Sequence, residues 1–208
     1  MKTLLCNLTI FLILGYAPLP GAERPNISVI DSLTLTIVET TFAETPVSPG
    51  DTIAMNIDLG TPQEAEYCRQ RIGRYLNDKS LTIFRNYNRL SSFHGLVIEI
   101  SRFRPASVYS EPESDGFFGE NYSERTVQVY LTGQLFDAAE GRIIGSIEGN
   151  LTARDRIKYS MIDELELSEF PFTKGKRQAY SGWETVLEPL LVVSSVAVVV
   201  LLFFTQRN

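Results

Sequence analysis

The sequence has few of the residues from which enzyme and metal sites are usually built. It contains two cysteines and a single histidine, His94. A metal site of the usual histidine and cysteine kind needs three or four such ligands. A histidine-based triad would depend on His94, which stands in a polar stretch without a recognisable partner motif. Neither G-x-S-x-G nor a phosphate-binding glycine loop occurs. We therefore expect no enzyme activity, no metal and no cofactor.

Positive charge and disulfide-forming cysteines are also scarce. Residues 23–184 hold 17 Lys and Arg against 24 Asp and Glu, a net charge of −7. Nucleic-acid binding needs a basic face, so no nucleic-acid partner is expected. Cys68 is the one cysteine beyond the apolar start of the chain, and a disulfide-free exported domain favours a bacterial envelope. Three Asn-X-Ser/Thr patterns arise easily by chance and are interpreted as incidental: Asn26, Asn121 and Asn150.

The first 22 residues have the pattern of a secretory signal peptide. Lys2 gives a positive start, residues 4–17 are mostly apolar, and residues 18–22 break the helix and end on a small residue. Cys6 belongs to this leader. We expect cleavage near Ala22, and an uncleaved N-terminal anchor is the alternative.

A second apolar run lies at the other end of the sequence. Residues 190–204 carry no charge, and a membrane-spanning helix needs about 20 mostly apolar residues. Extending the run to residues 186–205 gives that length, with Pro189 in the first turn, where proline costs least. We predict a transmembrane helix at residues 186–205 and a cytoplasmic tail at residues 206–208. A buried helix or strand is the alternative, because many residues of the run are β-branched.

A leader followed by a terminal span places residues 23–185 outside the cytoplasm, on the periplasmic side of a bacterial inner membrane. Lys174, Lys176 and Arg177 then lie on the outer side, although positive charge usually favours the cytoplasmic side. We interpret these three residues and Trp183 as contacts with lipid headgroups. They belong to a juxtamembrane tether at residues 169–185.

Residues 23–168 have the pattern of one α+β domain, a mixed or antiparallel sheet with one or two packed helices. The clearest signal is a helix at residues 61–76, where Thr61 caps, Pro62 takes the first helical position and Glu64 completes a capping box. Cys68 is expected to be a small buried hydrophobe on this helix. After a linker at 23–32, alternation predicts strands at 33–42, 53–59, 81–85 and from 96 onward, a hairpin at 127–151 turning at 137–141, and a second helix at 155–167.

The stretch at residues 105–124 is predicted to be the least structured part of the domain. Phe117 and Phe118 are adjacent aromatics in a polar loop, which suits contact with a partner. The loop is also acidic, and we interpret its carboxylates as solvated and not as a cation site: Glu111, Glu113, Asp115 and Glu120.

The order of elements resembles a family of bacterial envelope domains. The resemblance rests on residues 61–76, 96–103 and 130–137 (YLTGQLFD), with the D-x-x-x-G turn at 137–141 between two long strands. The domains are of the curli-secretion-channel type and of the type found at the amino terminus of the Tol-Pal translocation protein. The resemblance implies an α+β sheet domain that works in envelope assembly or export by protein contact.

These observations predict a single-pass, membrane-anchored domain that binds other envelope proteins in assembly or transport. One alternative is a carboxylate-dependent envelope hydrolase, which would need two acids facing each other across a cleft. The other alternative is a ligand-binding ectodomain.

Cysteine labelling in intact cells tests the predicted topology. With Cys68 replaced by serine, we expect a new cysteine beside residues 117–118 to react with a membrane-impermeant maleimide. A cysteine added after residue 208 should be protected until the cells are opened. A protected loop would contradict the prediction and place the domain in the cytoplasm.

Overall fold

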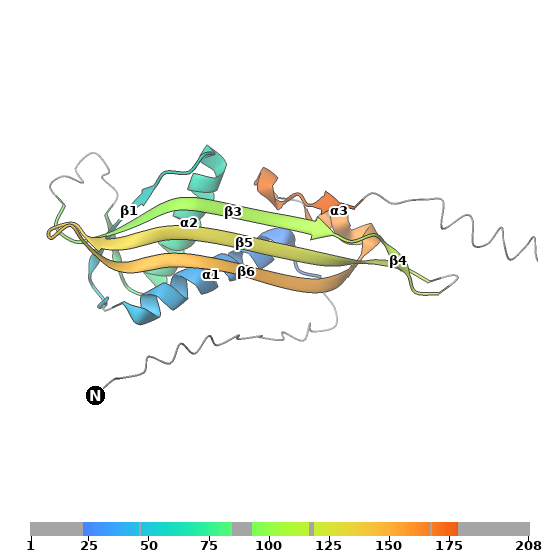
Figure 1. Cartoon of the computed structure of the whole chain (residues 1–208), viewed down its shortest axis with the longest axis horizontal. Helices are drawn as coiled ribbons and strands as arrows, with labels where there is room; N and C mark the ends of the chain where they lie inside the picture. The colour runs from blue at the N-terminus through green and yellow to red at the C-terminus, as the bar shows by residue number, and fades with distance from the viewer. Residues whose placement is uncertain (1–22, 46, 85–92, 117–118, 167, 179–208) are drawn as a thin grey trace, which may run out of the picture.

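The structure is a computed structural model that describes residues 23–45, 47–84, 93–116, 119–166 and 168–178. In these residues the chain forms one mixed sheet whose helices lie on a single face (Figure 1). The predicted α+β class and mixed sheet are confirmed. The elements are α1 (Asn26–Glu44), β1 (Thr52–Ile57), α2 (Pro62–Asp78), β2 (Thr82–Phe84), β3 (Leu96–Tyr109), β4 (Glu113–Ser114), β5 (Asn121–Asp137), β6 (Arg142–Lys158), η2 (Tyr159–Met161), α3 (Ile162–Leu165), η3 (Pro171–Thr173) and β7 (Lys176–Arg177).

Three long strands, β3, β5 and β6, form the body of the sheet as an antiparallel meander. β1 joins the other side of β3 in parallel and carries β2 beyond it, while β4 and β7 pair with the ends of β5 and β3. The predicted hairpin is confirmed but longer, because β5 and β6 pair from Tyr122↔Lys158 to Asp137↔Arg142. Its turn is the expected one: the Gly141 N–H donates to the Asp137 carbonyl at 2.8 Å, and Gly141 has a φ of 64°.

The core lies between one face of the sheet and the two long helices. α2 begins as predicted, with the Thr61 hydroxyl accepting from the Glu64 N–H at 3.3 Å. Cys68 is fully buried on α2, and burial raises the pKa of its thiol, so it is a small core residue as expected. α1 crosses the strands obliquely and packs tightly on β6, where a Cβ atom at Gly149 would lie 2.5 Å from the Ile37 side chain.

The prediction of a linker at 23–32 and a strand at 33–42 was wrong from residue 26 onward, because α1 spans Asn26–Glu44. The helix buries residues three and four apart, among them Ile30, Thr34 and Ile37. Its β-branched residues alternate with other residues in the sequence, and this pattern is typical of a strand. In the structure the hydroxyls of its Ser and Thr residues bond within the helix: Thr36 donates to the Ser32 carbonyl at 2.8 Å, and Ser32 and Thr40 repeat this i to i−4 pattern.

Two further local predictions were wrong in extent. About half of residues 105–124 is strand, because β3 continues to Tyr109, β4 spans Glu113–Ser114 and β5 begins at Asn121. The helix expected at 155–167 is shorter and begins later, since β6 runs to Lys158 and is followed by one turn of η2 and four residues of α3. In both places long antiparallel pairing outweighs the local pattern.

Residues 169–178, the first part of the expected tether, pack against the domain. Phe170 and Phe172 lie against the Tyr67 ring, with centroids 5.4 and 5.2 Å away, and β7 pairs with β3. No helix among the described residues is long and apolar enough to cross a membrane. The predicted leader (1–22), the rest of the tether (179–185), the span (186–205) and the tail (206–208) lie outside the described residues.

A buried arginine joins both ends of the described domain to the sheet. Arg125 on β5 has no exposed surface, donates from Nε to Asp155 at 2.8 Å and donates to the Arg24 carbonyl at 2.6 Å. It also donates to the Asn26 side chain at 3.0 Å, and Asn26 in turn donates to the Tyr109 hydroxyl and the Thr173 carbonyl. Burial raises the pKa of the Tyr109 phenol to about 12, so its hydroxyl stays protonated within the network.

We expect the substitution Arg125→Met to lower the free energy of unfolding by about 3–5 kcal/mol. It would leave the Asp155 carboxylate and the buried Asn26 side chain without their shared donor. Urea unfolding followed by circular dichroism measures the change. The control is Arg154→Met, one residue from Asp155 but with a 70% exposed side chain, which should change stability by about 0.5 kcal/mol or less. Equal losses in both variants would contradict the importance of the network.

Candidate functional site

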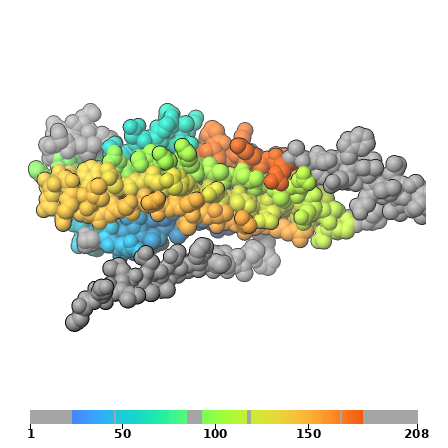
Figure 2. All heavy atoms as spheres, in the orientation of Figure 1, coloured from blue at the N-terminus to red at the C-terminus, as the bar shows by residue number. Residues whose placement is uncertain are grey.

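One face of the long sheet carries no helix. Figure 2 views the molecule from this side, where side chains of β3, β5 and β6 form the surface. Because side chains alternate along a strand, residues of β5 that point away from the core gather here with their neighbours on β3 and β6. From one end to the other the paired rows include Glu99–Gln134–Ser146, Arg102–Thr132–Glu148, Arg104–Tyr130–Asn150 and Ala106–Gln128–Thr152.

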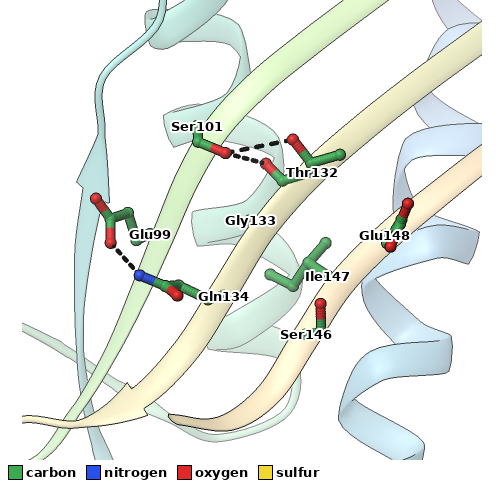
Figure 3. Close-up of a pocket in the computed structure, with 8 residues that line it drawn as sticks. All are labelled: Glu99, Ser101, Thr132, Gly133, Gln134, Ser146, Ile147 and Glu148. Atoms are coloured by element: carbon green, nitrogen blue, oxygen red, sulfur yellow. Dashed lines mark hydrogen bonds between the residues drawn. The ribbon is translucent and has the colours of Figure 1, made fainter. Parts of the chain in front are cut away.

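A shallow polar hollow of about 320 Å³ lies on this face (Figure 3). Gln134 donates its amide N–H to the Glu99 carboxylate at 2.7 Å, and the Ser101 hydroxyl lies 3.3 Å from both the Thr132 carbonyl and the Thr132 hydroxyl. Ser146 and Glu148 border the other side. A register shift between Ile100 and Arg102 inserts Ser101 as an extra residue on β3, and such a bulge redirects a side chain at a fixed point of a sheet.

Charges of both signs are interspersed over the uncovered face. Arg102 and Arg104 are exposed on β3, and Glu148 is exposed on β6. Farther along, the Arg156 guanidinium lies 4.5 Å from the Tyr122 ring centroid, and Arg154 lies 4.0 Å from Glu124. The surface therefore offers donors, acceptors and charges without an enclosed apolar cavity, whereas small-molecule sites are mostly concave and apolar.

The lipid-contact residues predicted from the sequence have different surroundings. Lys174 and Lys176 are exposed. Arg177 forms ion pairs with Asp163 and with Glu166, the latter at 3.7 Å, and its hydrogen bond to Asp163 raises the pKa of its guanidinium. Arg177 thus helps to hold β7 against the domain. Phe117, Phe118 and Trp183 lie outside the described residues, so their expected contacts remain predictions.

The acidic residues of the predicted loop lie at or beside the β4–β5 hairpin and are exposed: Glu111, Glu113, Asp115 and Glu120. Glu120 pairs with Lys158 at 2.7 Å. Hydrogen bonds from Lys158 and Tyr122, and then the positive charge of Lys158, lower the pKa of the Glu120 carboxyl. No group of three His, Cys, Asp or Glu residues in the described part of the chain could hold a metal ion. His94 is exposed. Two acids, Glu99 and Glu148, line the hollow on the uncovered face, and the hydrolase alternative stays a prediction.

Sequence reasoning missed Arg125 and gave no structural role to Asn26. Arg125 falls at an inward position of β5, between Ser123 and Val127, and extending the hairpin pattern two residues backward would have placed it there. Asn26 begins one of the three Asn-X-Ser/Thr patterns, but its side chain is fully buried and donates two hydrogen bonds. A folded domain has no room for a glycan at that position.

No family model matches the sequence, and no curated protein matches it. Among solved structures, the chain is similar to a minor lipoprotein from Acinetobacter baumannii, with 14% identity over 56% of this chain and 71% of that one and a TM-score of 0.33. It is similar to the rare lipoprotein B from Shewanella oneidensis, with 8% identity over 74% and 97% of the two chains and a TM-score of 0.28. It is also similar to the LpoB C-terminal domain from Salmonella enterica, with 12% identity over 62% and 95% and a TM-score of 0.27. Similarity at this level assigns neither a family nor a function to this chain.

Proposed function

We propose that this chain is a membrane-anchored domain outside the cytoplasm that binds another protein of the bacterial envelope through its uncovered sheet face. The observation that carries the proposal is the one-sided sheet, in which helices cover one face of β3, β5 and β6 and leave the other to solvent (Figures 1 and 2). The anchor and the location rest on the apolar segments at the two ends of the sequence.

The chemistry of the face favours a protein partner. Hydroxyl, amide and charged groups of both signs can form hydrogen bonds and ion pairs across a broad flat contact, and such polar groups determine specificity at protein interfaces. The hollow between Glu99 and Glu148 is shallow and polar, so it suits one or two side chains of a partner better than a buried small ligand. We propose that the domain acts by binding and not by catalysis.

Photo-crosslinking at single positions tests this function. A photoreactive amino acid at Ala106 or Gln128, in the middle of the uncovered face, should form an adduct with one envelope protein in intact cells. The same amino acid at Gln70, which is exposed on α2 on the helical side, should not form it. The reversal Arg102→Glu with Arg104→Glu should reduce the Ala106 adduct about tenfold, because it reverses the charge beside the contact.

Two results would contradict the proposal. The first is an equal yield of the same adduct from Gln70 and Ala106. The second is no adduct with any other protein from either face position while the protein is present at its normal level in the membrane.

A further inference from the structure

The outer edge of β6 is the longest unpaired strand edge among the described residues. β6 pairs with β5 over 17 residues, and no strand in the described part of the chain pairs with its other side. Strands of globular proteins are commonly 5–6 residues long, so this edge is about three times the usual length. It contains no proline, although proteins often use proline to prevent an edge from pairing with another chain.

Two hydrogen bonds show which backbone groups point outward from this edge. The Lys158 N–H donates to the Glu23 carboxylate at 2.7 Å, and the Ser146 carbonyl accepts from the Thr41 hydroxyl at 3.4 Å. In an antiparallel ladder the N–H and C=O of one residue point to the same side, and alternate residues point to the same side as each other. The even-numbered residues of β6 therefore turn their backbone groups outward. Residues 148–156 lie between Ser146 and Lys158, whose outward backbone groups are already bonded to Thr41 and Glu23.

We propose that a second copy of this chain pairs with β6 in antiparallel orientation, with the two-fold axis at Thr152. A symmetric pair must match outward-pointing residues with each other, so even positions lie opposite even positions. An axis at Thr152 lies at the centre of residues 148–156 and so uses all of them. It pairs position 148 with 156, 150 with 154 and 152 with itself. The proposal stands independently of the proposed function.

Charge complementarity selects a second copy as the occupant of this edge. The axis at Thr152 places Glu148 opposite Arg156 of the second copy, and the symmetry repeats this ion pair. Both residues are exposed on the uncovered face, and opposite charges directly across an antiparallel pair stabilise it. On the inner face the same register places Ile147 opposite Ile157 of the second copy, and Gly149, which has no side chain, opposite Asp155.

The oblique course of α1 leaves space for the second copy. At one end Asn26 contacts Tyr109 of β3 and Arg125 of β5. Toward its other end Ile37 packs on Gly149, and Thr45 lies near Gly145 of β6. Antiparallel pairing places residues 145–149 of one copy opposite residues 155–159 of the other. The α1 helices of the two copies therefore approach the paired β6 strands at different positions. The two uncovered faces would become one continuous sheet surface.

Charge reversal in the full-length protein tests the pairing. Sedimentation equilibrium in a density-matched detergent should give a dimer, and Glu148→Arg or Arg156→Glu alone should raise its dissociation constant about tenfold or more. The double variant Glu148→Arg with Arg156→Glu should restore it to within about threefold, because the opposite charges face each other again. The control Arg102→Glu reverses an exposed charge on the same face, but on the interior strand β3, and should leave the constant unchanged.

Disulfide formation tests the register. Cα atoms of a hydrogen-bonded antiparallel pair lie about 5.5 Å apart, within the reach of a disulfide. Thr152→Cys should therefore give a covalent dimer on mild oxidation, whereas Asn150→Cys alone should not, since its partner is position 154. Three outcomes would overturn the proposal: a monomeric wild-type protein, a dimer insensitive to both single charge reversals, or equal crosslinking of Thr152→Cys and Asn150→Cys.

Discussion

The register of β5 is the constraint on which the rest of this domain depends. The strand pairs with β3 on one side and β6 on the other along nearly its whole length. A slip of one residue would turn every side chain to the opposite face. Val127, Val129 and Leu131 would leave the core, and Arg125 would lose its place between Asp155 and Asn26. The apolar residues and the buried arginine therefore specify the same register. Arg125 also holds Asn26, which in turn bonds to Thr173 near the other end of the described chain.

A sheet covered on one face only has two kinds of surface with different uses. Its inner face is specified by packing, as the close approach of Ile37 to Gly149 illustrates. The outer face is not required for the core, so its residues are available for recognition, and they are polar and of mixed charge. The edge of β6 offers a third surface, whose backbone groups can extend the sheet. Pairing along that edge would enlarge the outer face without covering it, so binding to another protein and self-association are compatible.

The sequence predicted an element well wherever its signal came from local chemistry. Thr61 with Pro62 located the start of α2, and Gly141 located the turn of the long hairpin. It failed at α1, where threonines produce the alternation of a strand, and the helix is selected by burial of Ile30, Thr34 and Ile37 against the sheet. It also shortened β5 and β6, because long-range pairing continues through residues whose local pattern is charged and polar. The uncovered face and the edge of β6 could not be predicted, since both depend on the order of strands.

By itself the sequence determined the α+β class, the position of α2, the long hairpin and the burial of Cys68. These features depend on capping, turn conformation and apolar spacing, all of which act between residues close together in the chain. Only the tertiary structure decided that α1 is a helix, that Arg125 is buried with Asn26 and Asp155, and that one sheet face and one strand edge remain uncovered. These depend on contacts between segments far apart in the chain, such as Arg125 with Asn26 and Asn26 with Thr173, and local chemistry does not encode which distant segments meet.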